Sequence, residues 1–89
     1  MKLSELVEKL KKYGDVKEIG DAFNGDILVV LETAEVKGGP FDGLYISPWE
    51  FKIKRNLIDA FAIEPVDGKK VRVYLFLKKG VIDDDGTRR

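Results

Sequence analysis

Cationic and aromatic side chains alternate with aliphatic ones near the carboxyl end of the chain, from residue 70 to residue 78. Successive side chains of an extended strand point to opposite faces. One predicted face is aliphatic and contains Val71, Val73, Leu75 and Leu77. The other carries two aromatics among three cations: Lys70, Arg72, Tyr74, Phe76 and Lys78. Aromatics that stack on bases, beside cations that bind phosphates, are typical of surfaces for single-stranded nucleic acid. We favour the alternative that Tyr74 and Phe76 are covered by a neighbouring strand, a loop or a second subunit.

The other reactive groups are few. The chain has no Cys and no His, which excludes thiolate nucleophiles, disulfides, Cys-ligated zinc and histidine bases. Ser4 and Ser47 are the only serines, and each is placed to cap a helix. Carboxylate pairs can form in space, with candidates Asp59, Glu64 and Glu50, but sequence spacing does not bring them together. We therefore predict a non-catalytic protein with no cofactor and no metal.

Charge is distributed unevenly in a chain whose formal net charge is zero. Residues 1–51 hold six Lys and Arg against ten Asp and Glu, whereas residues 52–80 hold eight against three. The second segment predicts a basic patch, which would comprise Lys52, Lys54, Arg55, Lys69, Lys70, Arg72, Lys78 and Lys79. The alternative is a set of solvated strand edges, where Lys discourages aggregation.

The composition predicts one small domain. Of the 89 residues, 44% are hydrophobic, which is enough for one core. We predict a globular domain over residues 1–82 and a charged, mobile tail over 83–89, whose Asp83, Asp84 and Asp85 do not fit a calcium loop. No segment has the pattern of a signal peptide or a membrane span, so we expect a cytoplasmic protein that does not bind membranes. Abundant Lys and Glu without Cys, His or Gln resemble proteins from hot environments.

The first predicted element is an amphipathic helix near the amino terminus. Its apolar residues follow helical spacing, and they are Leu3, Leu6, Val7, Leu10 and Tyr13. Ser4 is expected to cap the start and Gly14 to stop the end. We expect this helix to pack on a sheet.

Two hairpins are predicted on either side of the centre. Asn24-Gly25 separates strands over 16–23 and 26–36 and indicates a two-residue turn. The run from Ile27 to Leu31 does not alternate, so this strand should be central and covered on both faces. Asp67-Gly68 joins the last two strands, with Pro65 at a strand end.

The stretch Lys37–Phe51 connects the halves. Glycines and prolines at Gly38-Gly39-Pro40 and Asp42-Gly43 predict a loop, and 44–46 a short returning strand. Beyond it, residues 47–50 have the pattern of a capping box, but Trp49, Phe51 and Ile53 alternate as in a strand. We favour strands over 49–53 and 57–63 with a turn at Arg55-Asn56. Phe41, Trp49 and Phe51 are expected in the core.

A resemblance to Sm-like RNA-binding barrels is carried by Lys37-Gly38-Gly39, Phe41, Gly43-Leu44 and Asn56-Leu57. That family has a helix before five strands, which would imply a small barrel and RNA as a partner. Asn56 lies too far downstream, an extra hairpin precedes Lys37, and Lys79-Gly80 replaces the family's Arg-Gly pair. We therefore do not assign the chain to this family.

Together these patterns predict an α+β fold, with the helix packed on about five mostly antiparallel strands as a meander or partly closed small barrel. The predicted function is a binding module, with a protein partner or a second copy on an open sheet face. The alternative is an RNA or single-stranded nucleic-acid-binding module that uses the basic half. The candidate binding residues are Lys70, Arg72, Tyr74, Phe76, Lys78, Lys52 and Lys54.

Overall fold

The computed structural model describes residues 1–33, 36–39, 43–46, 51–67 and 70–86, with backbone alone for 36–39, 43–46 and 51–52. The expected core positions of Phe41, Trp49 and the Phe51 side chain, and the capping box at 47–50, lie outside these residues. The elements are α1 (Leu3–Lys11), β1 (Gly14–Asp21), β2 (Ile27–Thr33), β3 (Val36–Gly39), β4 (Gly43–Ile46), β5 (Phe51–Ile53), the 3₁₀ turn η1 (Arg55–Leu57), β6 (Ile58–Pro65) and β7 (Val71–Leu77).

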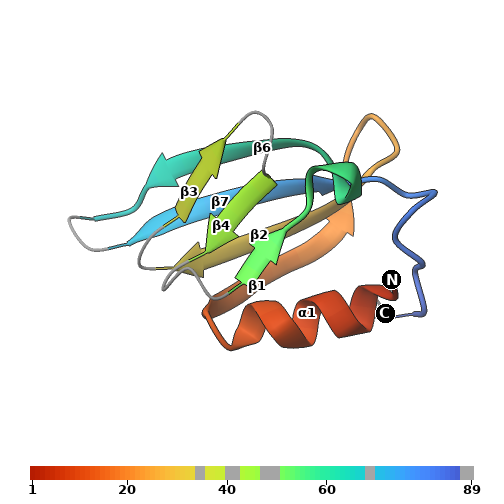
Figure 1. Ribbon diagram of the computed structural model, residues 1–89, viewed down its shortest axis with the longest axis horizontal. Helices are drawn as coiled ribbons and strands as arrows, with labels where there is room; N and C mark the ends of the chain where they lie inside the picture. The colour runs from red at the N-terminus through yellow and green to blue at the C-terminus, as the bar shows by residue number, and fades with distance from the viewer. Residues whose placement is uncertain (34–35, 40–42, 47–50, 68–69, 87–89) are drawn as a thin grey trace.

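These elements form two antiparallel sheets. The larger has the order β1-β2-β7-β6 and the smaller the order β3-β4-β5. In Figure 1 the small sheet and α1 lie on the same side of the larger sheet. We call this side of the larger sheet its inner face and the opposite side its outer face. The α+β class is confirmed, but the count of five strands is wrong: the described residues contain seven strands. The larger sheet is not a meander, because the small sheet is inserted between β2 and β6.

The inner face contains the core. Val73, Leu75 and Leu77 of β7 have no exposed surface, and they pack with the apolar stripe of α1 and with Ile53 of β5. The predicted alternation of this last strand is confirmed. Ile27, Val29 and Leu31 of β2 complete the same layer, and Val30 is buried on the other face. The prediction that β2 is central is confirmed by its position between β1 and β7, but its outer face is covered only in part, since Leu28 is partly exposed.

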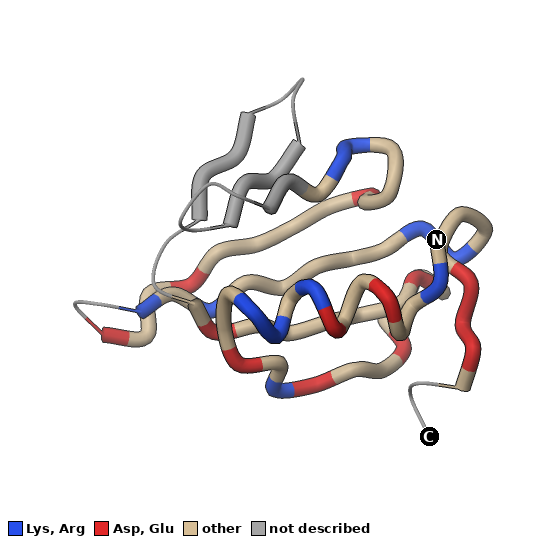
Figure 2. Tube along the Cα trace, turned by 60° about the horizontal axis from the view of Figure 1, so that its bottom comes forward, with Lys and Arg blue, Asp and Glu red and all other residues tan. Residues whose placement is uncertain are grey.

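The apolar stripe of α1 is as predicted, but both predicted ends are wrong. The N-cap is Lys2, which makes no side-chain cap, and Ser4 lies within the first turn. Gly14 does not end the helix but begins β1. A Cβ atom at this position would overlap the carbonyl oxygen of Glu32. Glycine is needed here for the close approach of two strands. Figure 2 shows the charged residues of α1 along its solvent side.

The first hairpin is confirmed with a different turn. Ala22 N–H donates to the Asp26 carbonyl at 2.8 Å, and Gly25 N–H donates to the Ala22 carbonyl at 3.0 Å. The loop is therefore a three-residue one, Phe23-Asn24-Gly25, with Gly25 at φ 91°. A type I turn closed by a left-handed glycine is a common alternative to the two-residue turn. The side chain of Phe23 at its tip is fully exposed.

The described part of the central stretch is extended. Residues 51–53 form β5, η1 covers the predicted turn at Arg55-Asn56, and β6 follows, so the strand interpretation is confirmed for these residues. Gly38 and Gly39, expected in a loop, lie within β3. Pro65 is the last residue of β6, as predicted.

The carboxyl-terminal segment contacts the start of α1. Ile82 is fully buried, and Leu3 N–H donates to the Asp83 carbonyl at 2.8 Å. Ser4 Oγ donates to a carboxylate oxygen of Asp85. Figure 2 shows this acidic segment close to the amino terminus. Among the described residues, no helix has the length and apolar character required to cross a membrane.

Candidate interaction surface

Strand β6 is the least covered strand of the larger sheet. After the buried Ile58, every residue of β6 is exposed. An α-helix is about 10 Å wide and neighbouring strands are about 4.8 Å apart, so one helix covers about two strands. Helix α1 packs beside β1, at the opposite edge from β6. Its position therefore leaves β6 without a covering helix.

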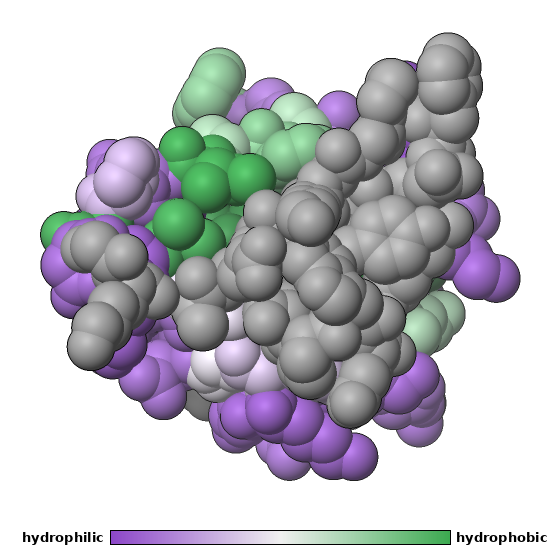
Figure 3. Space-filling model, turned by 60° about the vertical axis from the view of Figure 1, so that its left-hand side comes forward, coloured by the Kyte–Doolittle hydropathy of each residue, from purple (hydrophilic) through white to green (hydrophobic). Residues whose placement is uncertain are grey.

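Two of the side chains exposed on β6 are large and apolar. Phe61 pairs with Leu75 and Ile63 with Val73, so both point to the inner face. They remain 40% and 42% exposed, and Val66 just beyond β6 is 40% exposed. Figure 3 shows hydrophobic atoms gathered in a patch on this side of the molecule. We call Phe61 and Ile63 the β6 patch.

The outer face carries the residues that the sequence singled out. Tyr74, Phe76 and Arg72 are half-buried there, because the aliphatic residues of β7 lie on the inner face and form the core with α1 and Ile53. Leu28 lies opposite Phe76 on one side and Ala60 on the other. No described helix or strand lies over this face.

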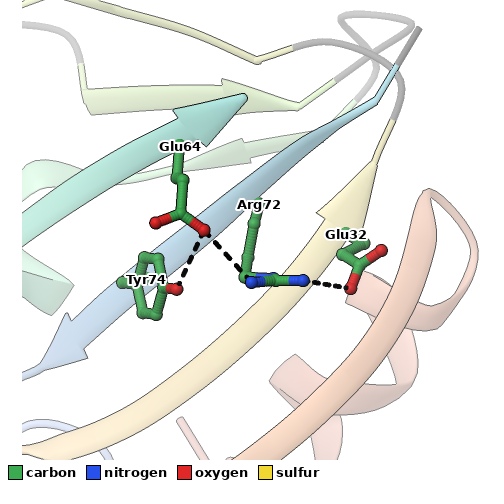
Figure 4. A network of polar contacts seen from close by, with 4 residues as sticks. All are labelled: Glu32, Glu64, Arg72 and Tyr74. Carbon is green, nitrogen blue, oxygen red and sulfur yellow. Dashed lines mark hydrogen bonds and ion pairs between the residues drawn. The ribbon is translucent and has the colours of Figure 1, made fainter. Parts of the chain in front are cut away.

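Arg72 is held by two carboxylates from the neighbouring strands. Its guanidinium lies 3.2 Å from Glu32 of β2 and 3.1 Å from Glu64 of β6. The Tyr74 hydroxyl donates to the same Glu64 oxygen at 3.4 Å. Figure 4 shows this network running across β2, β7 and β6. Hydrogen bonding with Tyr74 and with Glu32 raises the pKa of Arg72 above its ordinary value. The charge of Arg72 is thus already compensated within the protein.

The other predicted cations do not form one patch with Arg72. Lys70 precedes β7 and Lys78 follows it, so they are about 26 Å apart along an extended strand. Lys78 Nζ lies 3.9 Å from Asp59 Oδ1. Lys54 precedes η1 at the Lys78 end of the sheet, and Lys52 is in β5, with its side chain outside the described residues.

A pair of carboxyl groups, which sequence spacing did not reveal, joins two distant segments. Asp26, at the end of the first hairpin, is buried, and its side chain hydrogen-bonds with that of Asp59. This hydrogen bond, burial and the charge of Asp59 raise the pKa of Asp26 above its ordinary value. Two such carboxyls share one proton more readily than they carry two negative charges.

An open hollow lies beside this pair. Its volume is about 440 Å³, and its lining is Arg55, Asn56, Ile58, Asp59 and Lys78. A second shallow hollow, of about 390 Å³, runs between α1 and β1. Among the described residues, no group of three or more Asp and Glu is arranged to hold a metal ion.

Comparison with protein-family models, with curated proteins and with solved structures finds no match for this chain.

Proposed function

We propose that this chain is a non-catalytic interaction module that binds an extended segment of a protein along β6. The observation that carries this proposal is the combination of an exposed edge strand with the β6 patch. Edge strands bind extended peptides through backbone hydrogen bonds, and pockets or apolar side chains on alternate residues add specificity. Such an edge is otherwise an aggregation hazard that proteins usually block with charges.

The backbone of β6 is oriented to accept another strand. Val66 N–H donates to the Lys70 carbonyl at 3.0 Å, so the backbone groups of Val66, Glu64 and Ala62 point toward β7. In an antiparallel pair the direction alternates from residue to residue. The N–H and C=O groups of Phe61 and Ile63 therefore point away from β7, toward the open edge. Pro65 stands at the next outward position, where its missing N–H removes no bond of the sheet.

A labelled peptide of alternating Thr and Val, a sequence with high strand propensity, tests this function. We expect saturable binding by fluorescence polarisation and slower amide exchange at Phe61 and Ile63 when the peptide is bound. Ile63→Lys should weaken binding at least about tenfold, because a Lys on an edge strand disfavours strand addition. Lys17→Ala, on the opposite edge, is the matched control. Absence of saturable binding up to millimolar peptide would reject the proposal.

Nucleic-acid binding is a second candidate, supported by the half-buried Tyr74 and Phe76 on the outer face. The pairing of Arg72 with two carboxylates and the separation of Lys70 from Lys78 give it less support than strand binding has. Binding of a short single-stranded RNA that weakens steeply with salt, and on Tyr74→Ala, is its expected signature. Undetectable binding at low salt would remove it.

The proposal that the chain is not an enzyme rests on the absence of His and Cys from the sequence. Asp26 and Asp59 meet one requirement for carboxylate chemistry, since they lie together beside a hollow. Among the described residues, no group of three or more carboxylates that could hold a metal ion includes them. We therefore assign the pair a structural role.

A further inference from the structure

The outward groups of β6 have a symmetry that suggests one particular partner. Phe61 and Ile63 lie on either side of Ala62, and all three residues are exposed. Suppose that a second copy of β6 pairs antiparallel with the first, related to it by a two-fold axis through Ala62. Phe61 of each copy then lies opposite Ile63 of the other. Both outward residues of each strand would then exchange N–H···O=C bonds with the other strand.

We propose that a second copy of this chain pairs with β6 in this register and joins the two larger sheets into one. This inference rests on the proposed function, because it names the segment that β6 binds. The resulting interface is isologous, with the same residues contributed by each copy, as in most protein dimers.

The side chains support this register on both faces. On the inner face, each Phe61 lies beside Ile63 of the second copy, so four partly exposed apolar side chains cover one another. On the outer face, Ala62 meets Ala62 and each Glu64 faces Ala60, so no like charges stand opposite each other. Moving the axis to Phe61 would instead place Ile63 opposite Asp59. The register centred on Ala62 is therefore the better match of apolar surfaces.

A disulfide at the proposed axis provides a direct test, since the wild-type chain has no cysteine. Ala62 would face Ala62 as a non-hydrogen-bonded pair with Cα atoms about 4.5 Å apart, which lies within the range for a disulfide. Ala62→Cys should therefore give a covalent dimer on mild oxidation. Ala60→Cys is the matched control, because it changes an exposed Ala on the same face. In this control, residue 60 of one copy would lie about 13 Å from residue 60 of the other, measured along the strands.

The experiment combines this crosslink with sedimentation of the wild-type chain over a range of concentrations. We expect a reversible monomer–dimer equilibrium, and crosslinking of Ala62→Cys at least about tenfold faster than that of Ala60→Cys. Adding Ile63→Lys should abolish both. A dimer in which Ala60→Cys crosslinks as fast would overturn the register, and a chain that stays monomeric at every concentration would overturn the pairing.

These failures are distinct from failure of the proposed function. A monomeric chain that still binds the Thr-Val peptide along β6 would retain strand binding and reject the second copy as its occupant. A monomeric chain that binds no peptide would reject both. A dimer that persists in Ile63→Lys would place self-association on another surface and reject the pairing of β6.

Discussion

The two edges of the larger sheet are protected to different degrees. Strand β1 carries four charged residues, Asp15, Lys17, Glu18 and Asp21, its register shifts between Val16 and Glu18, and α1 packs beside it. Strand β6 carries Asp59 and Glu64, and its register shift lies at one end, between Ile58 and Ala60. Charges, bulges and covering elements are the devices by which proteins block edge strands. β1 has all three along its length, whereas the middle of β6 has none.

The difference indicates that the two edges have different uses. At β1 the chain is closed against other strands. At β6 it retains aromatic and branched residues with outward backbone groups, although a single Lys would have protected the strand. We interpret the unprotected edge as the binding side of the molecule, and the following experiments are designed to separate the two edges.

The largest expected effect comes from Gly14→Ala, which acts on the β1 edge. The new Cβ atom would overlap the Glu32 carbonyl oxygen and lie 2.9 Å from Thr33 Cβ. Forcing β1 from β2 should lower the free energy of unfolding by about 2 to 3 kcal/mol, measured by urea denaturation. Gly20→Ala on the same strand is the control, since its Cβ would meet nothing within 4 Å. Equal effects of the two substitutions would contradict the close approach at Gly14.

Arg72→Ala should have a smaller effect, because it breaks the connection between the centre of the sheet and β6. The substitution removes both ion pairs and leaves the largely buried Glu32 carboxylate without its cation. We expect a loss of about 1 kcal/mol and faster amide exchange in β6. Lys78→Ala removes an exposed and longer contact, 3.9 Å, to Asp59, and should change stability less. A larger effect of Lys78→Ala would show that the network does not hold β6.

Asp26→Asn tests the carboxyl pair that connects the first hairpin to the start of β6. The folded-state pKa of Asp26 is raised, so its protonated form is favoured by folding. The protonated Asp26 carboxyl therefore contributes its full stabilisation below the unfolded-state pKa of about 4. This contribution is lost as the pH rises through the pKa of Asp26 in the folded protein. We therefore expect Asp26→Asn to raise the urea midpoint at pH 8, with little change at pH 3. A decrease at pH 8 would mean that the ionised pair is stabilising.

The smallest expected effect on folding is that of Ile63→Lys, which gives β6 the kind of charge that β1 already has. Ile63 is 42% exposed, and a Lys stem can cover the same apolar surface with its ammonium in solvent. The free energy of unfolding of the monomer should change by less than about 1 kcal/mol, whereas binding along β6 should be lost. A large loss of stability would show that Ile63 is a core residue.

Several local features could be predicted from the sequence because they depend on neighbouring residues. The apolar stripe of α1, the strand pattern of 71–77 and the turn signals at Asn24-Gly25 and Asp67-Gly68 each identified their element. The errors were also local. Ser4 and Gly14 have the residue types of helix caps, but Ser4 binds Asp85, far along the chain, and Gly14 is required by a neighbouring strand.

The candidate site was predicted in part. The alternation of β7 correctly separated Val73 and Leu75 from Tyr74 and Phe76, because the pleat alone fixes that division. It gave no indication that Arg72 is held by Glu32 and Glu64, which lie 40 and 8 residues away in the sequence. The β6 patch was missed for a related reason. Phe61 and Ile63 have the pattern of core residues, and whether they are covered depends on how far α1 and the small sheet extend over the inner face.

By itself the sequence determined the helix, the faces of the strands and the absence of His and Cys chemistry, since periodicity and composition are properties of the chain. The tertiary structure alone decided which strands became edges, which carboxyls met and which apolar residues stayed exposed. These depend on the register between strands distant in sequence and on the limited width of one helix. A helix about 10 Å wide cannot cover four strands about 4.8 Å apart. Ile53 of the small sheet joins the core with β7, and β6 is the strand that stays exposed.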